Sequence, residues 1–313
     1  MLKQKGKKKS IAVILWKIFR FVILLGLAYI LLYPIIYMIS MSLRPVEQVV
    51  DPLVVWIPRS LTLDNIKGAF EMMNFGVAFQ NTFTIFVVAA LIEVMSCAIV
   101  GYGFARFEFP LKKFWFIGVL ITILVPMQCI MIPMVTQFRY FDFFMLGNIG
   151  SLFGEKWTVN LLNTPLALYV PSIFASGIRS GLFIFIYRQF FLGLPPELED
   201  AAYIDGCGPF KTFLKVMMPL SSGAIIIVLL LSVVAHWNDS LYSNFFFENL
   251  NTLSGQLSSI GNSVYQATKD AADGMDVAYK QSGAMLFMLF PLTIFIIFQR
   301  WFTESIQTAG LVG

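Results

Sequence analysis

Six windows of the sequence are each long and apolar enough to cross a lipid bilayer. A membrane-spanning helix needs about 20 mainly apolar residues, because lipid offers the backbone no hydrogen-bond partners. With 58% hydrophobic and 13% charged residues, the 313-residue chain is predicted to be an all-α integral membrane protein that forms one transmembrane domain. The six predicted transmembrane helices lie at roughly 18–42, 82–103, 114–135, 166–190, 217–238 and 282–302.

The distribution of lysine and arginine predicts how these helices are oriented. Residues 1–17 form a basic tail without any acid, and cytoplasmic flanks of membrane helices retain positive charge. Both termini are therefore expected in the cytoplasm of a multi-pass plasma-membrane protein. Six spans then place segments 104–113 and 191–216 inside and segments 43–81, 136–165 and 239–281 outside.

Several kinds of chemistry lack the residues they need. His236 is the only histidine, and the three cysteines form no CxxC pair, so neither a metal site nor a catalytic triad is predicted. There is no phosphate-binding loop of the GxxxxGK type. The chain is expected to be non-enzymatic, without a cofactor and without a nucleic-acid partner, so that any ATP with Mg²⁺ would be bound by a separate subunit.

A polar segment at 195–219 interrupts two long apolar runs. Pro195 and Pro196 end the fourth span, and acidic residues in the first turn of a helix predicted at about 197–204 complement its positive end. Glycines then break that helix, and Pro209 begins a second, amphipathic helix that leads into the fifth span. The sequence therefore predicts a cytoplasmic helical hairpin, although periodicity alone is equally consistent with an ordinary polar loop.

The segment contains an acid, two alanines, a glycine four residues later, an aliphatic residue and a proline, at Asp200, Ala201, Ala202, Gly206, Val216 and Pro219. In this order and spacing the residues resemble the EAA motif of the permease subunits of ABC importers. Two departures are mild, since the usual glutamate is aspartate, preceded by Glu199, and Met218 replaces the usual leucine. In that family the loop forms coupling helices that seat in a cleft of the ATPase, which implies a coupling role for Glu199, Asp200, Ala201, Ala202, Asp205, Gly206, Val216 and Pro219.

The resemblance narrows the family to its carbohydrate branch. Within that branch, the chain is similar to the second permease subunit of maltose-type importers. The resemblance implies a bacterial plasma-membrane complex with a homologous second permease, two ATPase subunits, an external sugar-binding protein and surrounding lipid. It also implies a second ATPase contact through the tail at 309–313, for which a disordered end is an equal alternative. The segments that carry the resemblance are Tyr102–Phe107, Arg188–Phe191, Ala202–Gly206, Trp237–Asp239 and Gln299–Phe302.

Two charged residues lie near the middle of predicted spans. A charge at mid-span costs roughly 2.5–3.5 kcal/mol on insertion scales, so Glu93 and Arg179 are expected to have partners or to line a wet cavity. One interpretation is that they neutralise each other, in which case exchanging the two charges would restore transport lost in either single mutant. A second is that one or both line the translocation pathway and contact sugar hydroxyls or, in the case of Arg179, the carboxylate of an acidic sugar. A third is that one of them faces water or a partner subunit.

Three further residues are candidates for the substrate path. Trp237 and Asn238 combine an aromatic face with an amide, as sugar sites do, but a tryptophan that anchors its helix beside a helix-contacting asparagine is the more common arrangement. Gln128 lies in a proline-interrupted span that is either shaped for the pathway or an ordinary membrane helix.

The predicted function is inward carbohydrate transport by alternating access, driven by an ATPase in trans. One alternative is an ABC-importer permease for a non-sugar solute. A less favoured one is an ion-coupled carrier, which would run without any ATPase. The sequence does not identify the sugar or the partner chains, and it does not decide whether this subunit touches substrate.

Overall fold

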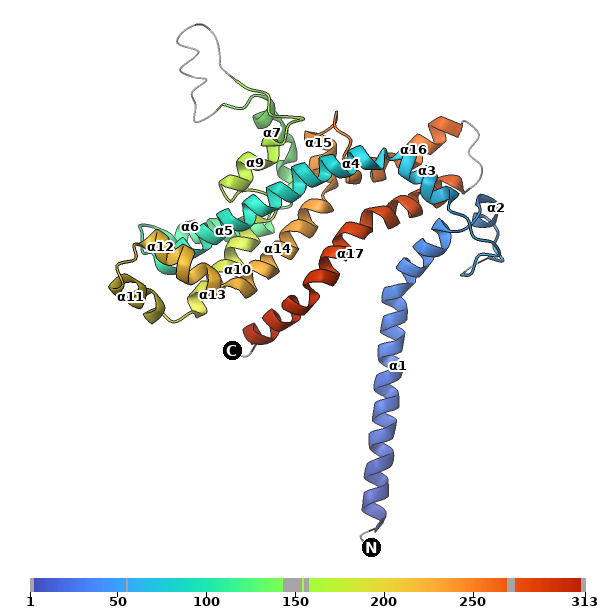
Figure 1. The fold of residues 1–313 in the computed structure, drawn as a ribbon, viewed down its shortest axis with the longest axis horizontal. Helices are drawn as coiled ribbons and strands as arrows, with labels where there is room; N and C mark the ends of the chain where they lie inside the picture. The colour runs from blue at the N-terminus through green and yellow to red at the C-terminus, as the bar shows by residue number, and fades with distance from the viewer. Residues whose placement is uncertain (1–2, 55, 143–153, 155–157, 269–273, 311–313) are drawn as a thin grey trace. The chain divides into compact units, whose positions relative to one another are not determined.

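The computed structural model describes residues 3–54, 56–142, 154, 158–268 and 274–310 (Figure 1). Across these ranges the chain is helical, and its only strand-like feature is an isolated antiparallel bridge between Phe141 and Val159. Its contacts divide the chain into two compact units. The first unit comprises Met1–Met72 and Ser259–Leu286, and the second comprises Met73–Ser258 and Phe287–Gly313.

The first unit is dominated by a 40-residue helix, α1 (Lys3–Ser42). From residue 12 onward most of its side chains are exposed and apolar, as expected of a helix surrounded by lipid. Beyond its end, the buried Arg44 donates through Nη1 to Val54 O at 2.6 Å and through Nη2 to Ser40 Oγ at 2.8 Å. The unit also contains α2 (Val46–Val49), α3 (Asp64–Met72) and parts of α16 (Leu253–Thr268) and α17 (Met275–Gly310).

The second unit is built on α5 (Val88–Arg106), which packs against α10 (Ser180–Gly193) and α14 (Ser222–Trp237) (Figure 1). A Cβ at Gly101 would lie 2.6 Å from Tyr187 Cβ, so glycine allows α5 and α10 to approach closely. The other described helices of this unit are α4 (Phe75–Thr82), η1 (Phe83–Val87), α6 (Lys112–Leu124), α7 (Met127–Arg139), α9 (Leu166–Ile173), α11 (Glu197–Ile204), α12 (Pro209–Thr212), η3 (Phe213–Met217), α13 (Met218–Leu220), α15 (Ser240–Phe246) and the remaining parts of α16 and α17.

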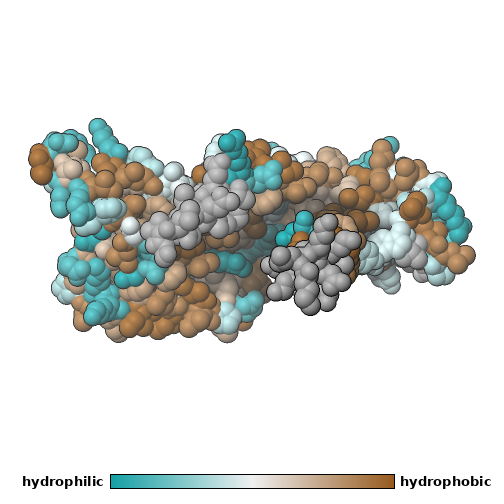
Figure 2. Space-filling model, turned by 90° about the horizontal axis from the view of Figure 1, so that it is seen from below, coloured by the Kyte–Doolittle hydropathy of each residue, from teal (hydrophilic) through white to brown (hydrophobic). Residues whose placement is uncertain are grey.

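Three helical stretches among the described residues are long and apolar enough to cross a membrane, namely Ala12–Ser42, Phe75–Arg106 and Met275–Trp301. Two bent helix pairs bring the possible number to five if each pair forms one span. These segments coincide with the first, second, third, fifth and sixth predicted windows. Hydrophobic residues cover much of the surface drawn in Figure 2, which fits a protein embedded in lipid.

Three of the predicted spans are not single straight helices. The window 114–135 breaks between α6 and α7 at an angle of 104°, where Pro126 takes an extended conformation. The window 217–238 breaks at Ser221, with 81° between the helices on either side. The window 166–190 is interrupted at 174–179, where Ala175 and Arg179 have φ angles of 51° and 63°, which a continuing right-handed helix does not accommodate. An apolar window reports hydropathy, not backbone conformation, and therefore misses these breaks.

Candidate functional site

The 195–219 loop forms the two helical segments that its sequence predicts. α11 spans Glu197–Ile204 and carries three acids in its first turn. Gly206 follows it with a φ of +79° and open space around its Cα, so glycine is needed there for its backbone conformation. Pro209 occupies the first turn of α12, which continues through the π-helical turn η3 into α13.

Glu199 anchors α11 to the end of α5. Its buried carboxylate accepts a hydrogen bond from Tyr102 Oη at 2.5 Å through Oε1, and its Oε2 lies 3.1 Å from Arg106 Nε. That Nε–H is aligned with no acceptor among the described residues, so the second contact is an ion pair without a well-formed hydrogen bond. Arg106 also donates from Nη2 to Leu194 O at 2.7 Å, which ties it to the end of α10.

An aromatic cluster around Tyr102 fixes the other side of the loop. The Tyr102 ring lies 5.4 Å from that of Phe191 in α10 and 5.0 Å from that of Phe213 in η3. Because Phe213 belongs to the second helical segment and Glu199 to the first, both arms of the hairpin rest on Tyr102. Tyr102 and Arg106 lie in one of the segments that carry the family resemblance, but the sequence did not predict a role for them in the site.

The eight residues predicted to couple to an ATPase divide into two groups. Glu199 and Ala202 are buried within this chain, and Val216 is half-buried against the α5–α10 core. The remaining five have exposed positions on the loop, and they are Asp200, Ala201, Asp205, Gly206 and Pro219. The acid that holds the hairpin in place is thus Glu199, whereas Asp200 is exposed.

The exposed side of the hairpin also carries large apolar side chains. Ile204 is 86% exposed and Phe210 is 67% exposed, and Tyr203 and Leu214 contribute to the same two helical segments. Sequence reasoning did not select these four residues. One feature of the sequence could have identified them: large apolar side chains occur in a segment predicted to lie outside the membrane, where water would otherwise surround them.

A second polar cluster lies inside the helix bundle around Glu93, which is fully buried. Ser180 Oγ donates to Glu93 Oε1, and Ser232 Oγ donates to Glu93 Oε2 at 3.2 Å. His236 Nε2 lies 3.6 Å from Glu93 Oε2, while its Nδ1 lies 2.9 Å from Ser232 O and so carries the ring proton. A Cβ at Gly177 would lie 2.7 Å from Glu93 Oε1, so the break between α9 and α10 passes directly beside this carboxylate.

Arg179 does not pair with Glu93. Its side chain is exposed at the start of α10, and no ion pair between the two occurs among the described residues. Arg179 instead lies near Asp239, whose carboxyl caps α15 by accepting from Tyr242 N at 2.7 Å. Burial raises the pKa of Asp239, and the charge of Arg179 acts in the opposite direction. The prediction of a Glu93–Arg179 ion pair is therefore corrected, because the helix break turns Arg179 away from the bundle.

The other candidates for the substrate path occupy different surroundings. Trp237 is 1% exposed, donates from Nε1 to Phe287 O at 3.1 Å and stacks on Phe290 at 4.2 Å. Asn238 and Gln128 are exposed, and Asn238 Nδ2 donates to Val234 O at 3.0 Å. The structure thus brings Glu93 together with His236, but it places Trp237 in a helix contact. Within the described ranges no group of three acidic, cysteine or histidine side chains is placed to hold a metal ion.

Comparison with known proteins gives consistent results. The chain is 28% identical over 319 residues to the arabinooligosaccharides transport system permease protein AraQ of Halalkalibacterium halodurans, covering 98% of this chain and 100% of that protein. It is 29% identical over 210 residues to the trehalose transport system permease protein SugB of Mycobacterium tuberculosis, covering 67% of this chain and 68% of that protein.

The fold resembles a chain in the crystal structure of a bacterial ABC transporter involved in the import of the acidic polysaccharide alginate. The TM-score is 0.70 at 18% identity, and the match covers 92% of this chain and 96% of that chain. The model of one protein family matches residues 97–308, which is more than half of the chain. The protein therefore belongs to the family described as binding-protein-dependent transport system inner membrane components.

Proposed function

We propose that this chain is a permease subunit of a bacterial ATP-driven importer that moves a carbohydrate inward across the plasma membrane. The proposal is supported by the family, and by relatives whose names specify arabinooligosaccharides and trehalose. Its partners would be a homologous permease, two ATPase subunits that bind ATP with Mg²⁺, and an external sugar-binding protein. The chain itself would catalyse no reaction.

The 195–219 loop is the proposed contact with the ATPase. The observation that carries this assignment is the division of the hairpin into a buried anchor at Glu199 and an exposed apolar side at Ile204 and Phe210. A loop that only connected two helices would need neither a buried ion pair nor large exposed apolar side chains. Closure of the ATPase would move α11, and the Glu199–Arg106 ion pair would transmit that movement to α5.

Six membrane spans with both termini in the cytoplasm are part of the same proposal. The two bent helix pairs supply the third and fifth spans, and the broken segment α9–α10 supplies the fourth. The basic tail before residue 18 and the position of the 195–219 loop then lie on the cytoplasmic side. Cysteine-accessibility labelling at Asn249, expected outside, and at Ala201, expected inside, tests the orientation.

Among the candidates for the substrate path, we favour the exposed residues Gln128, Asn238 and Arg179 over the buried ones. A solute can reach an exposed side chain without the helix contacts being broken, whereas Trp237 and Glu93 are enclosed. Cysteine at 128 should react with a water-soluble thiol reagent in at least one transport state. No reaction in any state would remove Gln128 from the pathway.

Copurification tests the proposed ATPase contact. A tagged wild-type chain should retain its ATPase in gentle detergent, and the complex should hydrolyse ATP. Ala201→Trp should lose the ATPase without unfolding, because the Ala201 side chain is exposed. Gly206→Pro should lose it as well, because proline cannot adopt a φ near +79°. Retention of the ATPase by both variants would refute the contact.

Asn249→Trp provides the matched control, since Asn249 is also exposed but lies after α15, remote in sequence from the loop. It should retain the ATPase. The sugar class is tested separately by uptake of labelled arabinooligosaccharides and trehalose against labelled amino acids and polyamines. Uptake of only the amino acids or polyamines would leave the permease role intact and refute the carbohydrate.

A further inference from the structure

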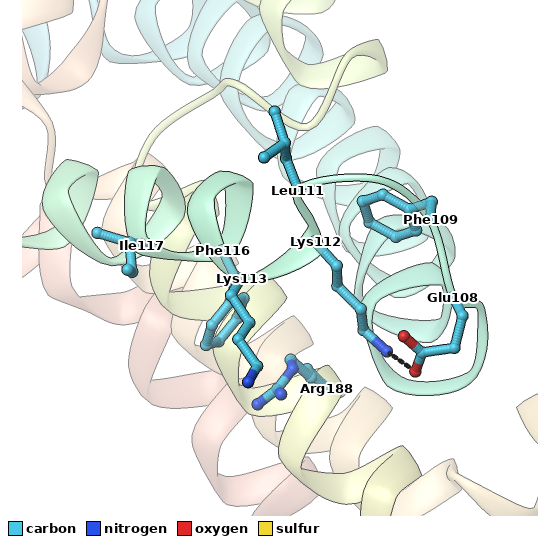
Figure 3. A pocket seen from close by; sticks show the side chains of 8 residues that line it. All are labelled: Glu108, Phe109, Leu111, Lys112, Lys113, Phe116, Ile117 and Arg188. Atoms are coloured by element: carbon cyan, nitrogen blue, oxygen red, sulfur yellow. Dashed lines mark hydrogen bonds and ion pairs between the residues drawn. The ribbon is translucent and has the colours of Figure 1, made fainter.

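A pocket of about 640 Å³ lies beside the end of α5, between the turn that follows it, α6 and α10 (Figure 3). Its position is fixed by close helix packing, because a Cβ at Gly181 in α10 would lie 2.2 Å from Thr122 Oγ1 in α6. The close packing of these two helices places Arg188 of α10 over the ring of Phe116 of α6, with 4.1 Å between Arg188 Cζ and the ring centroid. The pocket therefore belongs to the same end of the second unit as Arg106.

The charge of this pocket is positive. Lys112 Nζ lies 2.9 Å from Glu108 Oε1, so these two charges offset each other (Figure 3). Lys113 and Arg188 have no acidic partner among the described residues, and Figure 3 shows their side chains reaching toward the same space. Arg188 Nε is buried without a hydrogen-bond partner in the described structure, and a buried donor of this kind favours an acceptor from a bound group.

The surroundings of the pocket are apolar. Leu111 is 68% exposed and Ile117 is 55% exposed at its edge, and neighbouring residues of α6, Phe114 and Trp115, are also exposed. Tryptophan beside basic residues at one end of an apolar helix is typical of the boundary between lipid headgroups and acyl chains. A soluble anion would use only the cations, whereas a phospholipid would use the cations and the apolar rim together.

We propose that this pocket binds the phosphodiester headgroup of an anionic phospholipid. Lys113 and Arg188 would contact the phosphate oxygens, and the side chains of Leu111 and Ile117 would contact the acyl chains. A bound lipid would bridge α6 and α10 close to Arg106. The proposal depends on the chain lying in a membrane but not on which solute it transports, so failure of the carbohydrate assignment would leave it standing.

Native mass spectrometry of the purified complex, titrated with phosphatidylglycerol or phosphatidylcholine, tests this site. The wild type should bind phosphatidylglycerol in preference, and the double variant Lys113→Gln/Arg188→Gln should bind it roughly thirtyfold more weakly, since each basic residue near a membrane surface strengthens the binding of anionic lipid. Lys67→Gln/Arg139→Gln removes the same charge from exposed positions elsewhere and should bind like the wild type.

Two milder variants keep the test decisive if loss of Arg188 disturbs folding. Lys113→Gln alone should weaken binding severalfold, because Lys113 is exposed and its loss leaves no cavity. Glu108→Gln should strengthen binding, because it frees Lys112 from its ion pair and the Glu108 side chain is 87% exposed. Opposite effects from two surface substitutions on one pocket are not expected of a general loss of stability.

Four outcomes would overturn the proposal. Equal binding of the two lipids would show that the pocket does not select an anionic headgroup. The same conclusion would follow if Lys67→Gln/Arg139→Gln weakened phosphatidylglycerol binding as much as Lys113→Gln/Arg188→Gln. Displacement of the lipid by millimolar inorganic phosphate would identify a soluble anion as the ligand. Loss of the ATPase from the Lys113→Gln complex with lipid binding unchanged would identify the pocket as part of a protein contact.

Discussion

Among its described residues the second unit buries two glutamates, and their surroundings differ. Glu199, in the 195–219 loop, faces the cation of Arg106 and the hydroxyl of Tyr102. Glu93, inside the helix bundle, has no Lys or Arg ion-pair partner among the described residues and accepts from Ser180 and Ser232 beside His236. One carboxylate is thus held by an ion pair and the other by hydroxyl donors.

This difference indicates two roles. An ion pair with one partner on α11 and the other on α5 fixes one element to another, so movement of the first is transmitted to the second. Hydroxyl donors from α10 and α14 instead satisfy a carboxylate at the centre of three packed helices. Glu199 is therefore expected to govern coupling, and Glu93 is expected to govern the packing of the bundle.

The largest effect is expected from exchanging the charges of Glu93 and Arg179. The double variant Glu93→Arg/Arg179→Glu would place an unpaired guanidinium in a fully buried site, at a cost of about 3–5 kcal/mol. We expect it to be less stable than either single neutral variant, with no rescue of transport. Thermal unfolding of the detergent-solubilised chain measures this difference. Recovery of stability in the double variant would show that Glu93 and Arg179 do form an ion pair.

A slightly smaller effect is expected from Arg106→Ala. It leaves the Glu199 carboxylate buried without a neighbouring cation and should cost about 3 kcal/mol of local stability, most of it in α11. Hydrogen exchange should become faster in α11 and remain unchanged in α14. Arg139→Ala, at an exposed arginine, is the control, and unchanged exchange in α11 of the Arg106 variant would contradict the anchoring role.

Substitution of Glu93 should separate the need for charge from the need for an acceptor. Glu93→Leu leaves the buried hydroxyl of Ser180 without its acceptor and Ser232 Oγ with Ala90 O alone, at about 1–3 kcal/mol in total. Glu93→Gln keeps an acceptor oxygen and should cost less than about 1 kcal/mol. Comparing the melting temperatures of the two variants shows whether an acceptor is sufficient at this position. Equal destabilisation of both variants would mean that the charge itself is required.

Effects smaller than that of Arg106→Ala are expected from removing one hydroxyl at each site. Tyr102→Phe and Ser180→Ala each delete one donor to a buried carboxylate and should each cost about 1–1.5 kcal/mol. Only Tyr102→Phe should also reduce the amount of ATPase that copurifies. A reduction of similar size in Ser180→Ala would erase the functional distinction between the two sites.

Local signals in the sequence predict the 195–219 loop well. Three acids at the start of α11, glycine after it and Pro209 at the next helix act through backbone geometry and the helix dipole, which depend on neighbouring residues. The division of roles between Glu199 and Asp200 was not predictable in this way. It depends on Tyr102 and Arg106, which are about a hundred residues distant in the chain and reach Glu199 only after α5 and α10 have packed.

For Glu93, the sequence predicted the position of the residue but not its partners. Its place in an apolar helix was evident from the sequence, but its complete burial and its choice of partner were not. Ser180 and Ser232 lie in apolar windows, where nothing in the sequence indicates that they bind a carboxylate. Arg179, in contrast, is the obvious charged partner. The break at 174–179 decides the outcome, because it exposes Arg179 and turns the next residue, Ser180, toward Glu93.

A double-mutant cycle on Glu199 and Arg106 tests the central claim most directly. Glu199→Gln, Arg106→Gln and the double variant would be compared by the amount of ATPase retained per tagged permease and by the ATP hydrolysis of the purified complexes. If the two residues act as one link between α11 and α5, the double variant should lose no more than the worse single variant. Additive losses, or wild-type coupling in both single variants, would contradict the account.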